Sequence, residues 1–182
     1  AAVEIVTKVK NFATKSNIMK EAKNIFYVSN FLNFLDTNPY LLCFNNGIID
    51  FKTKEFRDGR PEDYCSKCTN IDYKDLSVID KKHIEEVSDF FAQLWPVESL
   101  RNYMWEHAAS VLIGTNHNQA FNIYTGCGRN GKSRFVELMG KILGDYKGTV
   151  PITLITAKRN NIGSTSSEIV QLKGTRYAVM QE

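Results

Sequence analysis

The segment that most constrains this chain is Gly126 to Ser133, which reads G-C-G-R-N-G-K-S. Its glycine, lysine and serine spacing is that of a phosphate-binding loop. In such a loop the glycines let consecutive backbone N–H groups turn towards a di- or triphosphate, and the lysine adds a positive charge at the β- and γ-phosphate oxygens. The serine hydroxyl supplies a ligand for Mg²⁺. The sequence therefore predicts a nucleotide-binding site at residues 126–133.

The residues on either side of this segment support that prediction. An apolar run, Phe121 to Tyr124, precedes it and predicts a strand. A helix is predicted after it, because apolar residues recur at helical spacing. These residues are Phe135, Leu138, Met139 and Ile142. A helix that begins directly at the loop favours an anion there, since its free N–H groups point at the ligand.

Length and composition indicate a globular protein. The chain has 182 residues, of which 43% are hydrophobic and 12% aromatic, and this is enough for a real core. The net charge of +3 permits contact with nucleic acid but does not indicate it, since no dense basic run exists. No apolar stretch approaches the length of a membrane span, and the first residues are not a signal peptide. We expect a soluble protein whose sequence starts as though cut from a longer chain.

The cysteines indicate a reducing compartment. They lack the regular spacing of a secreted disulfide framework, and one lies inside the phosphate loop. The four are Cys43, Cys65, Cys68 and Cys127. The C-x-x-C pair has the spacing of half a zinc knuckle, but there is no second pair and no histidine at ligand spacing. Neither a metal site nor redox chemistry is therefore predicted.

The part of the chain before the loop is predicted to be helical with a small β element. Helices are expected within residues 1–36, followed by short strands at 41–43, 47–51 and 55–57 with a tight turn at 52–54. Two further helices are predicted, one from Val78 to Trp95 that stops before a proline, and one that starts at Leu100 and ends before Gly114. Trp95, Tyr103 and Trp105 are predicted to lie in the core.

The end of the chain carries a candidate catalytic acid. Residues 176–180 predict a final strand, followed by Gln181 and Glu182. P-loop enzymes place the acid that orients water and the metal after such a strand. About fifty residues separate Ser133 from Glu182, enough for a helix, an intervening strand and a parallel return in the same sheet. The alternative interpretation is a solvated terminal acid.

The fold expected from these elements is α/β. A helical N-terminal domain with a small β-hairpin covers residues 1–114, and the first half of a P-loop ATPase core covers residues 115–182. Aromatic and basic residues mix along the hairpin, among them Phe51, Lys52 and Arg57. They could contact single-stranded nucleic acid, but a solvated basic face is the favoured interpretation. Lys158 and Arg159 could face a phosphate or a neighbouring subunit, but a solvated surface is the favoured interpretation there too.

Three segments together resemble the superfamily 3 primase-helicases of the poxvirus and phage/plasmid types, especially those of large double-stranded DNA viruses. The first is G-C-G-R-N-G-K-S-R-F, with Asn130 before the Gly-Lys-Ser. The second is N-P-Y-L-L-C-F-N-N-G-I-I-D-F-K-T-K-E-F-R-D-G-R-P-E-D-Y at residues 38–64, and the third is L-K-G-T-R-Y-A-V-M-Q-E at residues 172–182. The resemblance covers the chain from about Asp36 onward.

The resemblance implies an ATP- and Mg²⁺-dependent DNA helicase with an AAA+-like core. Such a protein assembles into a ring, usually a hexamer, acts on single-stranded or forked DNA, and works in a viral replication compartment of the host cytoplasm. The implied nucleotide-binding residues are Gly126, Gly128, Asn130, Gly131, Lys132 and Ser133. The implied catalytic residues are Lys132 and Glu182, and Ser133 and Glu182 would hold the metal. Gln181, where an acid is common, leaves open whether Glu182 handles both metal and water.

The resemblance also implies that further motifs, including an arginine finger, follow Glu182. Because an arginine finger contributes several orders of magnitude to phosphoryl transfer, we expect the 182-residue chain alone to hydrolyse ATP negligibly. Two other functions stay open. One is a nucleotide-dependent module that assembles a ring without unwinding DNA. The other is a small-molecule P-loop kinase, although such kinases typically begin with the phosphate loop.

Overall fold

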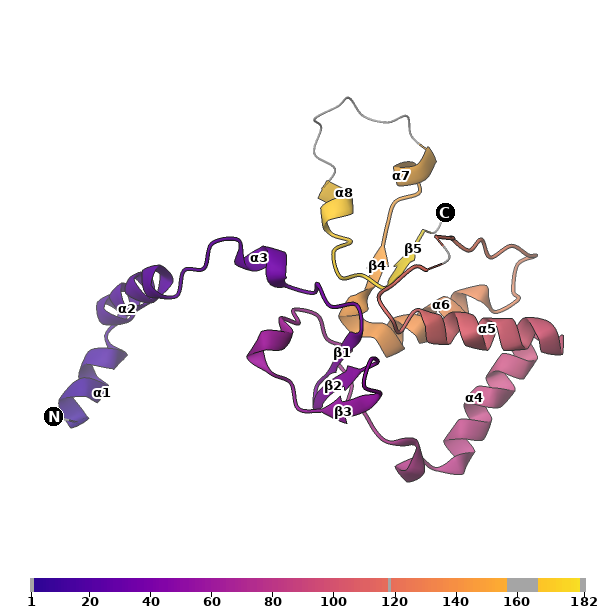
Figure 1. Ribbon diagram of the computed structural model, residues 1–182, viewed down its shortest axis with the longest axis horizontal. Coiled ribbons are helices and arrows are strands. Elements are labelled where there is room, and N and C mark those ends of the chain that lie inside the picture. The colour runs from indigo at the N-terminus through magenta and orange to yellow at the C-terminus, as the bar shows by residue number, and fades with distance from the viewer. Residues whose placement is uncertain (1, 118, 157–166, 181–182) are drawn as a thin grey trace. The chain divides into compact units, whose positions relative to one another are not determined.

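The computed structural model describes residues 2–117, 119–156 and 167–180 (Figure 1). Contacts divide the chain into two units, Ala1–Phe34 and Leu35–Glu182. Each unit is described by itself. Gln181, Glu182, Lys158 and Arg159 lie outside the described residues.

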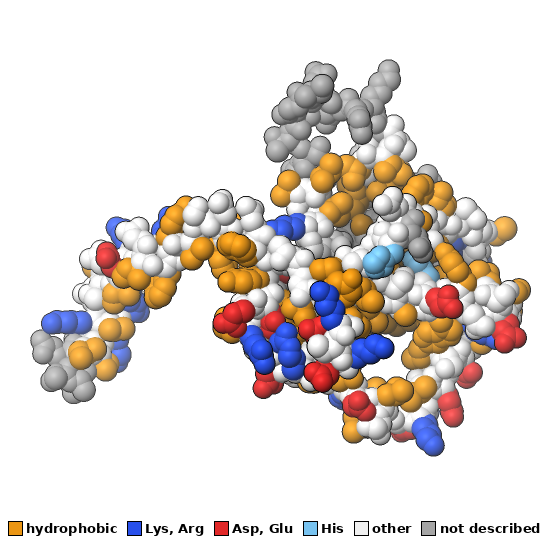
Figure 2. Space-filling model, viewed as in Figure 1, with side chains coloured by type: hydrophobic (Ala, Val, Ile, Leu, Met, Phe, Trp, Pro, Cys, Tyr) orange, Lys and Arg blue, Asp and Glu red, His pale blue; other side chains and the backbone are white. Residues whose placement is uncertain are grey.

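The first unit contains the helices α1 (Ala2–Lys10), α2 (Phe12–Ile25) and α3 (Phe31–Phe34). Helices were predicted in this region, and they are present. The side chain of Asn11 caps α2 by accepting a hydrogen bond from the N–H of Ala13 at 2.8 Å. No residue of α2 or α3 is buried. Apolar side chains therefore lie at the surface along this unit, with lysines among them (Figure 2).

The second unit begins with an antiparallel sheet of three strands, β1 (Leu41–Phe44), β2 (Gly47–Asp50) and β3 (Glu55–Arg57). The predicted hairpin is confirmed. Gly47 pairs with Phe44 at the first turn. A Cβ atom at Gly47 would lie 2.6 Å from the ring of Phe56, so only glycine fits this close approach of two strands.

An irregular segment follows the sheet and fastens it to the rest of the unit. Near its start, Arg57 donates two hydrogen bonds to the carboxylate of Asp63, at 2.7 and 2.9 Å. Further along, the N–H of Thr69 donates to the carbonyl of Cys43 on β1 at 2.9 Å. The carboxylate of Asp145 accepts from the N–H of Cys68 at 3.2 Å. The segment therefore links β1 to the C-terminal part of the chain.

Helices α4 (Lys81–Leu94) and α5 (Glu98–Ser110) confirm the two helices predicted before the loop. Asp80 caps α4 by accepting from the N–H of Lys82 at 2.9 Å. Beyond the end of α5, the N–H of Gly114 donates to the carbonyl of Pro39 at 2.8 Å. This bond returns the chain to the residues that precede the sheet.

The C-terminal part contains α6 (Lys132–Leu143), β4 (Lys147–Thr149), α7 (Thr153–Thr156), α8 (Ser167–Val170) and β5 (Tyr177–Val179). Strands β4 and β5 pair in parallel. The helix after the loop, the final strand and its parallel pairing with an intervening strand were all predicted, and all are confirmed. A single 3-10 turn, Gly144–Tyr146, joins α6 directly to β4.

The strand predicted at residues 121–124 is wrong. These residues form neither helix nor strand, and Phe121 and Ile123 are 78% and 72% exposed. An apolar run becomes a strand only where another strand satisfies its backbone hydrogen bonds. Among the described residues no strand pairs with this run.

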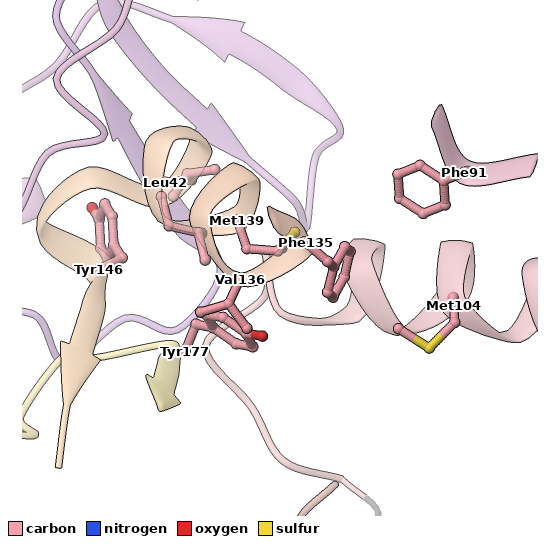
Figure 3. Close-up of a cluster of buried hydrophobic side chains, with 9 residues drawn as sticks. Leu42, Phe91, Met104, Phe135, Val136, Met139, Tyr146 and Tyr177 are labelled. Atoms are coloured by element: carbon pink, nitrogen blue, oxygen red, sulfur yellow. The ribbon is translucent and has the colours of Figure 1, made fainter. Parts of the chain in front are cut away.

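One hydrophobic core joins the elements of the second unit (Figure 3). Its buried members come from β1, α4, α5, α6, the 3-10 turn and β5, and they are Leu42, Phe91, Met104, Phe135, Val136, Met139, Leu143, Tyr146 and Tyr177. Phe91 is central, because its ring meets Phe135 edge-on at 5.9 Å and stacks on Trp105 at 3.6 Å. Residues on both sides of Gly114 thus share this core, and a domain boundary there stays a prediction.

Candidate nucleotide-binding site

The phosphate loop, residues 126–133, requires glycine at both of its ends. Gly131 has a left-handed backbone, with φ at +79°, and directly precedes α6. A Cβ atom there would lie 2.0 Å from a methyl carbon of Leu94 at the end of α4. Gly126 has φ at +148°, and a Cβ atom there would lie 2.3 Å from Nδ2 of Asn130. The positive φ therefore favours glycine at both positions, and a Cβ atom there would require the side chain of Leu94 or of Asn130 to shift.

Lys132 is held within the loop by neutral acceptors. Its Nζ donates to Oδ1 of Asn130 at 2.8 Å, to the carbonyl of Gly126 at 3.1 Å and to the carbonyl of Cys127 at 3.4 Å. Asn130 therefore lies against both Gly126 and Lys132, and its role in shaping the loop stays a prediction. The ammonium group lies among carbonyl oxygens that an anionic oxygen would replace with a stronger partner.

The space and the field around the loop suit an anion. Gly128 has no heavy atom within 4 Å of where its Cβ would be, and Ser133 in the first turn of α6 is exposed. The first N–H groups of a helix lack partners within it and carry partial positive charge. No acidic residue lies in the first turn of α6. The nearest carboxylate along the helix, Glu137, is engaged by Arg134 at 2.9 Å and Lys141 at 3.2 Å.

Tyr124 fastens the chain just before the loop, and sequence patterns did not indicate this role. Its hydroxyl lies 2.6 Å from Nε2 of His107 on α5. A second bond joins the same segments, because the hydroxyl of Tyr103 donates to Oδ1 of Asn122 at 3.0 Å. Tyr103 and His107 lie four residues apart on α5, but the sequence does not show that the segment with Asn122 and Tyr124 returns to this helix.

The aromatic residues of the helices are placed less deeply than predicted. Tyr103 is 52% exposed and Trp105 is 39% exposed, so the prediction that both lie in the core is wrong. One face of each ring stacks on a neighbouring ring. Tyr103 stacks on His107, and Trp105 stacks on Phe91. A large ring can satisfy one face and leave the other in water.

Cys43 on β1 lies near Cys65 and Cys68, which follow it by more than twenty residues in the sequence. Burial and the nearby thiols of Cys68 and Cys65 raise the pKa of Cys43 to about 12. Burial and the carboxylate of Asp63 raise the pKa of Cys65 to about 11. These two thiols are therefore protonated at neutral pH. Within the described residues no group of three or more histidine, cysteine or acidic side chains has the arrangement of a metal site.

The candidate acid cannot be placed. Glu182 lies outside the described residues, three positions after the last residue of β5. The strand before it is parallel to β4, as a return into the same sheet requires. Its role as metal ligand and catalytic acid stays a prediction.

Across the described ranges, no helix is both long enough and apolar enough to cross a bilayer.

Comparison with known proteins identifies relatives of one kind. Residues 4–93 match the family model described as D5 N terminal like. A predicted helicase of Acanthamoeba polyphaga mimivirus is 36% identical over 179 residues, which cover 98% of this chain and 18% of the relative. A predicted helicase of Invertebrate iridescent virus 3 is 33% identical over 178 residues, covering 97% of this chain and 19% of that protein.

More distant similarity points the same way. A predicted primase of African swine fever virus (isolate Warthog/Namibia/Wart80/1980) is 24% identical over 183 residues, covering 97% of this chain and 18% of the relative. The chain thus spans about a fifth of the length of these relatives. The family model covers residues 38–64, one of the segments on which the resemblance rests.

Proposed function

Because the chain belongs to the primase-helicase family of large double-stranded DNA viruses, we propose that it carries the nucleotide-binding loop of an ATP-dependent DNA helicase. The observation that carries this proposal is the environment of Lys132. Within the described residues, the hydrogen-bond acceptors of its ammonium group are the carbonyl oxygens of Gly126 and Cys127 and the amide oxygen of Asn130, all of them neutral.

The residues of the loop fit a nucleoside triphosphate. Backbone N–H groups from Gly126 to Gly131 would surround the phosphates, and Lys132 would exchange its carbonyl partners for phosphate oxygens. The Ser133 hydroxyl at the start of α6 would be a ligand for Mg²⁺. Mg²⁺, when bound, neutralises charge that develops between the β- and γ-phosphates. Glu182 would orient the attacking water, as its position after β5 suggests.

The proposed partner is DNA, because the relatives are named as helicases and primases. Ring formation is part of the same proposal, since an active site completed by a neighbouring subunit is what the family resemblance implies. A ring-building module that binds nucleotide without unwinding DNA is a second candidate. The exposed apolar side chains of the first unit favour it, because such surface is usually covered by another protein surface.

The proposal is tested by nucleotide binding. Calorimetry of the full-length protein with ADP and Mg²⁺ should give saturable binding, and Lys132→Ala should weaken it at least about tenfold, since a charge-assisted contact is lost. Lys141→Ala is the matched control, because Lys141 lies on the same helix but pairs only with Glu137 in the described structure. A correctly folded protein that binds neither ADP nor ATP would overturn the proposal.

A second experiment separates the two candidates. The full-length protein should unwind a forked duplex in an ATP-dependent way, and Lys132→Ala should abolish this activity. Nucleotide-dependent oligomerisation in light scattering, without unwinding or DNA-stimulated hydrolysis, would instead support the assembly module.

A further inference from the structure

The connection that leads into the phosphate loop has one partly buried side chain, that of Tyr124. Residues 119–125 form neither helix nor strand. Along the stretch from 119 to 130 every residue except Tyr124 is exposed. Without a sheet partner, the backbone of this connection is not positioned by regular hydrogen bonds. The place of Gly126, where the loop begins, therefore depends on side-chain contacts, of which those of Tyr124 are the nearest in sequence and the bond from Tyr103 to Asn122 is the next.

Tyr124 contacts three of the elements around the loop. Its hydroxyl lies 2.6 Å from Nε2 of His107 on α5. It also forms a side-chain hydrogen bond with Tyr177 on β5. Its ring meets Phe135 on α6, with the ring centroids 6.1 Å apart and the planes inclined at 64°. The side chain thus joins the helix before the loop, the helix after it and the final strand.

The hydrogen bonds of this group run in one direction. Burial lowers the pKa of His107, so its imidazole is neutral at neutral pH and offers one donor nitrogen. With the proton on Nε2, the imidazole donates to the hydroxyl oxygen of Tyr124, and the hydroxyl of Tyr124 donates in turn to the oxygen of Tyr177. Burial raises the pKa of both tyrosines, so both keep their protons.

Tyr124 is close in sequence to a hydrogen-bond acceptor of Lys132. Gly126 is two residues further along, and its carbonyl accepts a hydrogen bond from Nζ of Lys132 at 3.1 Å. Gly126 also lies against the amide of Asn130. A shift of Tyr124 would therefore move an acceptor of Lys132 and one wall of the loop.

We propose that Tyr124, held between His107 and Tyr177, is a positioning residue that fixes the phosphate loop in its nucleotide-binding conformation. This inference rests on the proposed nucleotide site. It connects α5, which belongs to the part of the chain before the loop, with the strand that leads to Glu182. A change in the orientation of α5 would reach the nucleotide through the bond between His107 and Tyr124.

The test is the affinity of variants for ADP with Mg²⁺, measured by calorimetry in the full-length protein. Tyr124→Phe keeps the ring and removes the hydroxyl, and it should weaken binding about five- to tenfold, because the hydrogen bonds with His107 and Tyr177 are both lost. Tyr146→Phe is the matched control. It removes the hydroxyl of another buried tyrosine. That hydroxyl donates to the carbonyl of Lys67 at 3.0 Å, and Lys67 is far from the loop in the sequence. It should lower thermal stability and leave the affinity unchanged.

A second pair of variants keeps the inference testable if Tyr124→Phe folds poorly. His107→Gln retains an amide that can donate to the hydroxyl of Tyr124 and should bind ADP within about twofold of the unaltered protein, whereas His107→Leu should weaken binding severalfold. Unchanged affinity in both Tyr124→Phe and His107→Leu would overturn the inference, as would an equal loss in Tyr146→Phe. Absence of binding by the unaltered protein would instead refute the nucleotide site itself.

Discussion

The guanidinium of Arg176 lies over the ring of Tyr146, 4.6 Å from its centroid. It also donates to the carbonyl oxygens of Leu112 and Leu41. Burial lowers the pKa of Arg176. One side chain at the start of β5 therefore joins β1, the end of α5 and the turn after α6.

Replacement of Arg176 by methionine should destabilise the protein by about 2–4 kcal/mol, because two carbonyl groups lose their donors inside the fold. Urea unfolding followed by circular dichroism measures this loss. Arg134→Ala is the control and should change the unfolding free energy by less than about 0.5 kcal/mol, since that arginine is exposed. Equal effects of the two substitutions would show that the contacts of Arg176 contribute no special stability.

Alkylation of Cys127 should report nucleotide binding. This thiol is exposed within the loop, whereas Cys43, Cys65 and Cys68 are partly buried. N-ethylmaleimide should therefore label Cys127 first, and ADP with Mg²⁺ should slow that labelling severalfold. Mass spectrometry identifies the labelled peptide, and a Cys127→Ser variant gives the background. Labelling at the same rate with saturating nucleotide would place the nucleotide elsewhere.

The close approach of Gly131 and Leu94 predicts non-additive substitutions. Gly131→Ala should destabilise the protein by about 2 kcal/mol or more, because it adds a clash to an unfavourable left-handed backbone. Leu94→Ala makes room for the added methyl group. The double variant should therefore lose about 1 kcal/mol less than the sum of the single variants. Strict additivity in chemical unfolding would show that the two sites do not contact each other.

The pair of Arg57 and Asp63 predicts a dependence of stability on acid pH. Hydrogen bonds from Arg57 lower the pKa of Asp63 below 3.8 in the folded protein. The folded state then binds its proton less readily than the unfolded chain, so this contribution is complete above about pH 4 and disappears as pH falls through the folded pKa. Unfolding free energies measured between about pH 2 and 6 should show this loss. The Asp63→Asn variant should show a smaller slope over the same range.

Local patterns in the sequence were sufficient to predict the helices and the hairpin. The caps and stops of α4 are local signals, with Asp80 at one end and Pro96 after the other. The turn at Gly47 depends on contacts between residues a few positions apart. Such interactions are encoded within a short window, so periodicity and turn chemistry identify them.

Contacts between distant segments could not be predicted in this way. The bond of Tyr124 with His107 and the clamp made by Arg176 depend on how whole elements pack. The strand expected at residues 121–124 failed for the same reason, because strand formation requires a neighbour that a local pattern does not supply. The composition of the phosphate loop was evident from the sequence, but the way that Leu94 presses on Gly131 was not.

The shared core limits how this protein can be divided or recombined. Leu42 and Phe91 come from the region that matches the D5 N terminal like model, yet they pack in the same cluster as Phe135 and Met139 of α6. A cut at Gly114 would leave each half with an open apolar face. Replacement of the upstream region by that of a relative would therefore require matching changes in α6, so a substitution in one part limits which residues the other can carry.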